Sequence, residues 1–181
     1  MVLNVDYVYL DKVFYKEYGK DYPQSDVKKW NFNIKIKNSH NCYAYALNKI
    51  SHKLKDKPQP GLFSHTHNSH SCKNYKIAIK NDAPNIIFTN FNKKCPKTFH
   101  KIFMAIDDKP NGDYHFYRQN NDGTWSHKPG RTDVTTLNAK DKPILNPLVS
   151  DRNYIHNKYT KPCFFACVNK HLSRAHSEEY K

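Results

Sequence analysis

The sequence has few glycines and prolines, 5 and 10 among 181 residues, and no long uncharged apolar run. Long flexible linkers and a membrane-spanning helix are therefore not expected. Four motifs are also missing: Gly-x-Ser-x-Gly, Gly-x-x-x-x-Gly-Lys, Cys-x-x-Cys and His-Glu-x-x-His. Serine hydrolases, phosphate-loop enzymes and common zinc sites are left without a sequence signature. We predict one domain over 1–181, with a core over about 38–168 and a polar tail over 169–181.

Acidic residues are scarce beside basic ones, 16 against 30, so the formal net charge is +14. Such a charge suits a polyanionic partner, whether nucleic acid, an acidic protein or an anionic membrane surface. The lysines are spread along the chain, however, and no arginine-rich run or clustered basic helix occurs. Composition therefore favours general solubility over nucleic-acid binding. A basic, non-enzymatic binding module is kept as an alternative function.

Five cysteines are present, and their odd number prevents them all from pairing within the chain: Cys42, Cys72, Cys95, Cys163 and Cys167. Their spacing matches no familiar disulfide framework. The first seven residues lack the basic start of a signal peptide. We therefore expect a reducing compartment, where Cys42 is a free thiol. That compartment is the cytoplasm, or the host cytoplasm for a viral protein or secreted effector.

The order of predicted elements indicates an α+β fold, with helices first and strands afterwards. Alanines and apolar residues at helical spacing predict a helix that ends before Pro58. Aromatic and β-branched runs bounded by turn residues predict the strands. The expected elements are short extended pieces over 1–37, helices over 40–54 and 73–82, and strands over 99–106, 114–119, 124–128 and 163–168.

Cys42 is the first candidate catalytic residue, because it follows Ser39 and Asn41, which can cap a helix. A thiol in the first helical turn faces unpaired backbone N–H groups and the positive end of the helix dipole. Both stabilise the thiolate, which is the nucleophilic form of cysteine. We therefore expect the pKa of Cys42 to lie below the ~8.5 of free cysteine.

Two histidines flank a strong hairpin signal at Asn120-Asn121-Asp122-Gly123. With Gly123 in the left-handed position of a three-residue loop, Tyr117 faces His127. His115 and His127 then project from one face of the sheet. A two- or four-residue loop would place them on opposite faces. In the first register His115 can take the Cys42 proton while His127 orients its ring.

These residues resemble the NlpC-type branch of the papain-like cysteine peptidases, which has the order Cys, His and then a polar residue. The blocks at 58–61 and 125–130 are similar to poorly characterised members from bacteria and large DNA viruses. The resemblance implies an α+β fold with the nucleophile helix packed on an antiparallel sheet. It also implies a thiol hydrolase, a cysteine peptidase or amidase, that forms an acyl-thioester on Cys42 and uses no cofactor.

The resemblance further implies a peptide or amide substrate, host proteins included. The Asp-Cys-Ser-Gly of the common bacterial pattern is replaced by residues 41–44, so cell-wall peptide cleavage is not expected. An acyltransferase with the same Cys–His site is an alternative, because an amine or alcohol can resolve the thioester instead of water.

Two further residues are candidates for substrate binding. Asn41 would stand beside the backbone N–H groups that receive the oxyanion, or would only cap the helix. Trp125 would form a wall of the cleft, or would only pack. The plain alternative is that Cys42 is a small buried apolar residue and that both histidines are surface residues of the hairpin.

The segment His65–Cys72 is dense in zinc-compatible side chains, which Cys95 or His100 could complete. Its composition is that of a solvated loop without paired ligand spacing, so we assign no metal there and expect the segment to be dispensable for folding. Cys163, Cys167 and His171 would span ~12 Å on a helix, too far for one ion. We interpret Cys163 and Cys167 as core residues.

Overall fold

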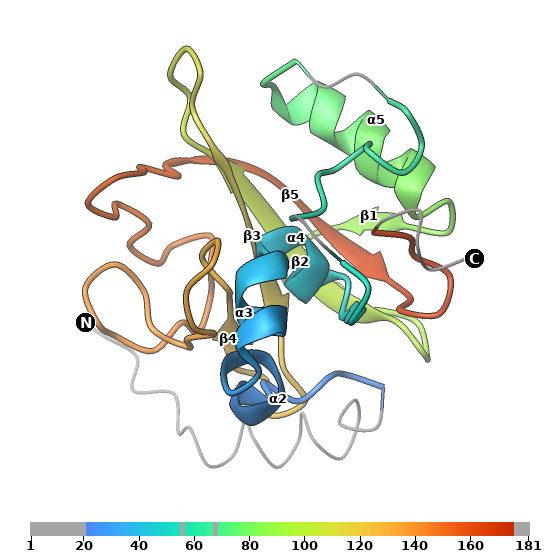
Figure 1. Cartoon of the computed structure of the whole chain (residues 1–181). Coiled ribbons are helices and arrows are strands. Elements are labelled where there is room, and N and C mark those ends of the chain that lie inside the picture. The colour runs from blue at the N-terminus through green and yellow to red at the C-terminus, as the bar shows by residue number, and fades with distance from the viewer. Residues whose placement is uncertain (1–20, 55–56, 67–68, 176–181) are drawn as a thin grey trace.

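The computed structural model describes residues 21–54, 57–66 and 69–175, and its centre is an antiparallel sheet (Figure 1). The five strands lie in the order β1-β5-β2-β3-β4. Their bounds are Ile87–Thr89 for β1, His100–Ile106 for β2, Tyr114–Gln119 for β3, Trp125–Ser126 for β4 and Lys161–Val168 for β5. The predicted α+β class is confirmed, and four of the five strands overlap predicted ones. β1 was not predicted.

The helices are shorter than the sequence pattern indicated: α2 is Val27–Asn31, α3 is Ile34–Ser39, α4 is Cys42–Ala46 and α5 is Cys72–Asp82. The predicted helix over 40–54 is wrong in length, because Asn48 adopts a φ of 55° and the Lys49 amide bonds back to the Ala44 carbonyl. A left-handed residue with such a bond ends a helix. The prediction of extended pieces over 1–37 is also wrong over 27–37, where α2 and α3 lie. Its first part, residues 1–20, lies outside the described residues.

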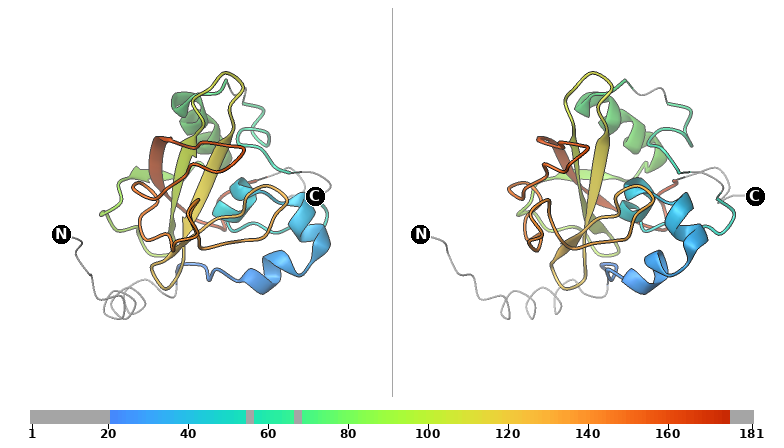
Figure 2. Two further views of the ribbon diagram at one scale, coloured as in Figure 1. Left: turned by 90° about the vertical axis from the view of Figure 1, so that its left-hand side faces the viewer. Right: turned by 60° about the vertical axis from the view of Figure 1, so that its left-hand side comes forward.

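Helices α4 and α5 pack on one face of the sheet and enclose its main apolar core (Figure 1). Tyr43 and Ala46 of α4 and Leu47, which caps it, share this cluster with Phe116 of β3 and Phe164 of β5. The opposite face carries a second cluster with Phe103, Tyr117, Trp125 and Phe165. The long segment between β4 and β5, orange in the two further views, lies beside the sheet (Figure 2). Side chains alternate between faces along each strand, so β3 contributes to both clusters.

Two disulfides tie β5 to distant parts of the chain. Cys72 at the start of α5 pairs with Cys163, and Cys95 pairs with Cys167. The sequence separations are 91 and 72 residues, while the Cα atoms lie 5.1 and 5.6 Å apart. Four of the five cysteines thus form disulfides, although their spacing matches no familiar framework. Spacing along the chain could not reveal pairs that only the sheet brings together.

Cys42 is the one free cysteine of the five, all of which lie in the described residues. Cys167 is buried, as predicted, whereas Cys163 is only partly buried beside the core. Across residues 21–54, 57–66 and 69–175, no helix is long and apolar enough to cross a membrane.

Candidate active site

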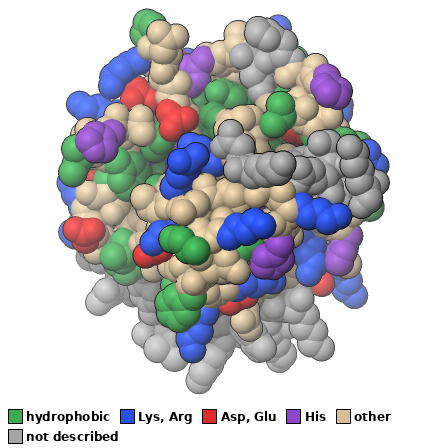
Figure 3. Space-filling view, viewed as in Figure 1, with side chains coloured by type: hydrophobic (Ala, Val, Ile, Leu, Met, Phe, Trp, Pro, Cys, Tyr) green, Lys and Arg blue, Asp and Glu red, His purple; other side chains and the backbone are tan. Residues whose placement is uncertain are grey.

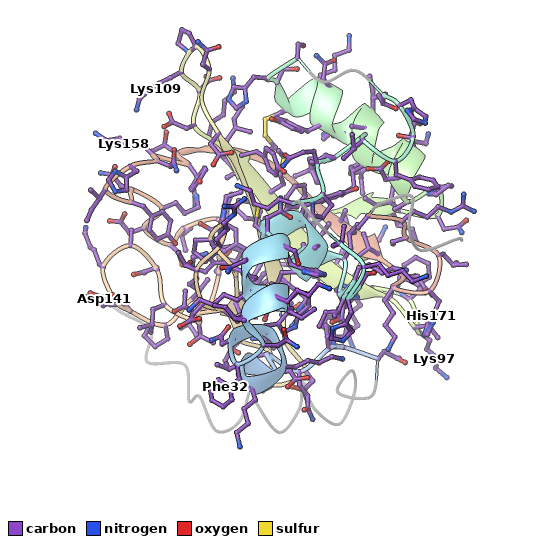
Figure 4. The ribbon with its side chains drawn as sticks, viewed as in Figure 1. Phe32, Lys97, Lys109, Asp141, Lys158 and His171 are labelled. Atoms are coloured by element: carbon purple, nitrogen blue, oxygen red, sulfur yellow. A yellow bond between two sulfur atoms is a disulfide. The ribbon has the colours of Figure 1, made fainter. Side chains whose placement is uncertain are left out.

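A cleft of about 710 Å³ lies where the start of α4, the start of β3 and the segment between β4 and β5 meet. Cys42, His115 and His127 all line it, as does Asn41. Asp141, labelled at the left in Figure 4, belongs to the same lining. Cys42 and His127, which are 85 positions apart in the sequence and were predicted to share a site, thus line one cavity.

The cleft lies along an unpaired stretch of the edge of β3. β4 pairs with β3 only at Arg118 and Gln119, so among the described residues no strand covers β3 before that point on this side. The backbone N–H of Phe116 bonds to the sulfur of Cys42, as does that of Tyr43. Cys42 comes from the helix-covered face, and this open edge lets its thiol share a cavity with His115, which lies on the other face.

Burial dominates the electrostatics of Cys42. The residue is only 5% exposed, and the loss of hydration raises the pKa of its thiol to about 12. The two N–H donors and the charge of Lys128 lower the pKa, but by less than burial raises it. Asp113 adds to the rise. The predicted pKa below that of free cysteine is therefore wrong. A helix of only five residues offers a weak dipole, and desolvation of the thiolate exceeds it.

The hairpin has the three-residue register that was predicted. Arg118 pairs with Ser126 and Gln119 with Trp125, and the Asn120 amide bonds to the Thr124 carbonyl. Gly123 has a φ of 87°, which its lack of a side chain permits. His115 and His127 consequently share a face, and Nε2 of His115 lies 2.7 Å from Nδ1 of His127. Both are buried, so the alternative that they are surface residues is wrong.

A backbone carbonyl determines which nitrogens of the pair carry protons. Nε2 of His127 lies 3.0 Å from the Leu137 carbonyl oxygen, which can only accept, so His127 carries its proton on Nε2. Nδ1 of neutral His127 is then an acceptor, and Nε2 of His115 must donate to it. Nδ1 of His115 is left with a lone pair and, among the described residues, no hydrogen-bond partner. It is the nitrogen able to take up a proton.

Both imidazoles are neutral near neutral pH. Burial lowers the pKa of His115 well below its usual value, and the proximity of His127 lowers it further. Burial likewise lowers the pKa of His127 to about 4, although its bond to Leu137 opposes the shift. Because the pKa of Cys42 is raised as well, the cysteine is a neutral thiol and both histidines are neutral imidazoles in the resting site. Within the described residues, no hydrogen bond joins the Cys42 thiol to His115.

Three further side chains hold the histidines. The ring of Tyr159 stacks on His115, with centroids 4.8 Å apart and planes at 24°. The Tyr159 hydroxyl donates to Asp113 at 3.0 Å, and the Tyr154 hydroxyl lies 3.3 Å from Nε2 of His127. Sequence reasoning missed all three. The two tyrosines follow the hairpin by some thirty residues in a segment without a periodic pattern, so no local signal could have found them.

The two predicted substrate-binding residues differ in position. Asn41 lines the cleft, but its Oδ1 accepts from the Ala44 amide at 3.2 Å and its Nδ2 donates to the Pro58 carbonyl at 2.7 Å. It therefore caps α4 and anchors the neighbouring loop. Trp125 is fully buried, packs against Phe165 and is not part of the cleft lining. Its assignment as a cleft wall is wrong, because it projects into the core of the second face.

Lys128 is an unpredicted support of the site. Its side chain is fully buried, and its ammonium donates to the carbonyls of Lys37, His40 and Gly130 at 2.7, 2.8 and 2.7 Å. Burial lowers its pKa to about 8. These bonds join the end of α3, the residues before Cys42 and the loop after β4. Lys128 thus holds together two walls of the cleft.

The segment His65–Cys72 loses its main ligand candidates. Cys72 and Cys95 are in disulfides, and Nε2 of His100 is 2.7 Å from the Ala46 carbonyl. Nε2 of His70 similarly meets the Asp107 carbonyl at 2.7 Å. Positions 67 and 68 lie outside the described residues. The last residue of the segment, Cys72, is not in a solvated loop, because it begins α5 and its disulfide joins that helix to the sheet. The prediction that the segment is dispensable for folding stays a prediction.

Comparison with known proteins finds a relative by sequence but no structural neighbour. No family model and no solved structure matches the chain. Over 125 residues the chain is 30% identical to insoluble matrix shell protein 1 of Ruditapes philippinarum, a stretch that covers 68% of this chain and 77% of that protein.

Proposed function

This chain belongs to the family of insoluble matrix shell protein 1, and we propose that it is a thiol-dependent acyl-transfer enzyme, in the first place a peptidase or amidase. Cys42 is the nucleophile, His115 the base and His127 the residue that orients the base. The resemblance to NlpC-type papain-like peptidases is a prediction that agrees with this assignment.

The observation that carries the proposal is the chain of contacts from the Leu137 carbonyl through His127 to His115. It leaves an unprotonated imidazole nitrogen in the same cleft as the free cysteine. Core histidines usually satisfy both ring nitrogens. A buried imidazole with one unused acceptor, aligned by a second imidazole, is instead the arrangement of a general base.

The neutral resting state suggests the sequence of proton transfers. As the sulfur attacks a carbonyl carbon, the thiol proton moves to Nδ1 of His115, and His127 stabilises the resulting imidazolium through its Nδ1 lone pair. His115 then returns that proton to the leaving amine, and an acyl-thioester remains on Cys42. His115 next takes a proton from water, whose oxygen replaces the sulfur, and the thiol is restored. An acceptor amine or alcohol in place of water gives the acyltransferase alternative.

A non-catalytic role in an extracellular matrix is the second candidate, because the relative is named as a matrix shell protein. The two disulfides also favour an oxidising compartment, in which such bonds persist. We therefore propose that the protein works in an oxidising compartment. The cytoplasmic location expected from the sequence stays a prediction. The basic binding module for nucleic acid or an acidic protein belongs to this non-catalytic class.

Acylation by p-nitrophenyl acetate at pH 7, without reducing agent, tests the enzyme directly. We expect a burst of nitrophenolate and an acetyl group on Cys42, identified by peptide mass spectrometry. Cys42→Ala should abolish the burst. His115→Ala should slow it by about 10²–10⁴-fold, the usual contribution of a general base, whereas His127→Asn should retain part of the rate.

His171→Ala is the matched control, because His171 is an exposed histidine outside the cleft. It should react like the wild type. Equal acylation rates in wild type and His115→Ala, with unchanged melting temperatures, would exclude a Cys–His pair and leave the matrix role as the better account.

A further inference from the structure

A second pocket, of about 590 Å³, lies outside the catalytic cleft and has a strongly basic lining. Lys29 of α2, Lys49 after α4, and Lys170 and His171 after β5 surround it, together with Asn48 and Ser51. No acidic residue lines it. Figure 4 labels His171 at the right-hand edge, and Figure 3 shows blue and purple side chains gathered on that side. Segments distant in sequence thus bring three ammonium groups to one hollow.

A buried positive charge lies directly behind this pocket. The Arg118 side chain is fully buried, and one of its terminal nitrogens donates to Oδ1 of Asn48 in the pocket wall at 3.0 Å and to the Tyr45 carbonyl at 3.1 Å. The other donates to the Gln24 carbonyl at 2.7 Å. No carboxylate in the described part of the chain forms an ion pair with it.

Buried guanidinium groups are normally paired with an acid, because an unpaired charge is costly to desolvate. The Tyr45 side chain, whose ring centroid lies 3.8 Å from the guanidinium carbon of Arg118, is its main partner, and Asp26 acts on it only through space. The positive potential extends further into the fold: beyond the effect of burial, Arg118 and Lys170 both lower the pKa of the buried His100. Among the described residues, basic side chains therefore outnumber acidic ones at this end of the molecule, which would attract an anion from outside.

We propose that this pocket binds a phosphate monoester group. Such a group carries about −1.5 to −2 charges and three acceptor oxygens at neutral pH, which suits several lysines that converge from different directions. A phosphodiester in nucleic acid carries only one charge per phosphate, so it would balance less of the positive charge that the three lysines bring together. The source of the group is either a phosphorylated peptide or a small phosphate ester.

Isothermal titration of the full chain with a phosphoserine peptide, its unphosphorylated form and inorganic phosphate tests the site. The pocket variant is the triple Lys29→Gln, Lys49→Gln and Lys170→Gln. The matched control is Lys73→Gln, Lys80→Gln and Lys142→Gln, which removes three exposed lysines elsewhere and lowers the net charge equally. Lys170→Gln alone serves as a second variant if the pocket triple melts at a lower temperature than the control.

We expect the phosphopeptide to bind the wild type, and the pocket triple to lose at least about tenfold in affinity while the control loses less than about twofold. Inorganic phosphate with the same dependence supports a small ester as the source, and tighter binding of the peptide supports a phosphoprotein. Equal losses in both triples would overturn the proposal in favour of general charge. Equal binding of the unphosphorylated peptide, or better binding of a sulfate monoester, would overturn it as well.

Discussion

The two faces of the sheet differ in what their buried side chains can do. On the helix-covered face, Phe116 and Phe164 pack against apolar residues of α4 and α5. On the other face the buried His115 ring stacks on Tyr159 and meets His127 edge-on, and hydrogen bonds join His115 to His127 and Tyr159 to Asp113. Along β3 these two environments alternate residue by residue, so neighbouring positions belong to an apolar core and to the proposed catalytic site.

The difference teaches that burial alone does not separate structural from chemical residues in this molecule. Phe116 and His115 are equally hidden, at 0% and 2% exposure. What distinguishes them is that His115 keeps an unused polar atom on the wall of a cavity, whereas Phe116 has no polar group to offer. The cavity exists because β4 leaves the first part of β3 uncovered.

The sharpest test of this contrast is to truncate adjacent residues of β3. Phe116→Ala should cost about 3–5 kcal/mol of unfolding free energy, because it opens a cavity in the main core. His115→Ala should cost less than half as much, because its ring borders an existing cleft. Guanidinium unfolding under non-reducing conditions measures both. Equal losses would mean that the two faces contribute alike to stability.

Loss of one disulfide should have a comparable but smaller effect on the fold. Replacing Cys95 and Cys167 by alanine removes a cross-link between residues 72 positions apart and should cost about 2–5 kcal/mol. Acylation of Cys42 below the melting temperature should be unaffected, because neither cysteine lines the cleft. Loss of acylation in the still-folded variant would show that the cross-link also shapes the site.

The histidine face should make the protein sensitive to acid. The pKa of His127 is about 4 in the folded protein, against an ordinary value of 6.5 for an unperturbed histidine. The unfolded chain therefore binds more protons than the folded protein between pH 4 and 6.5. Its contribution to stability is therefore full above pH 6.5 and is lost as pH falls through 4. His127→Asn should flatten the decline of melting temperature from pH 6.5 to 4. An unchanged slope would place the acid sensitivity elsewhere, whereas Phe116 variants should keep the wild-type slope.

The smallest effect is expected from the helix caps. Asn41→Ala removes the cap of α4 and the bond to Pro58 and should cost about 1–2 kcal/mol. Asn33→Ala removes the comparable cap of α3, where Oδ1 accepts from Lys35 and Ile36, and should cost about 1 kcal/mol or less. Only Asn41→Ala should also slow acylation of Cys42. If Asn33→Ala slows it equally, the effect is one of general stability.

Local patterns predicted much of this arrangement. The Asn-Asn-Asp-Gly turn predicted the hairpin and favoured the three-residue register among the alternatives, because turn geometry sets strand register over a short distance. The strands β2 and β5 followed from their apolar runs. The length of α4 did not, since residues 47–54 keep helical spacing while Asn48 turns the chain out of the helix. Trp125 shows the same limit: its type suited a cleft, and only packing placed it in the core.

The sequence by itself determined the α+β order of elements, the cap before Cys42 and the hairpin that carries His115 and His127, because each depends on residues a few positions apart. Only the tertiary structure decided which cysteines pair, how deeply Cys42 is buried and which tyrosines surround the histidines. Those features depend on contacts between segments separated by tens of residues, whose proximity arises from the packing of the whole sheet. The pKa of Cys42 illustrates the difference, because a local helix end favours the thiolate and the assembled core reverses that preference.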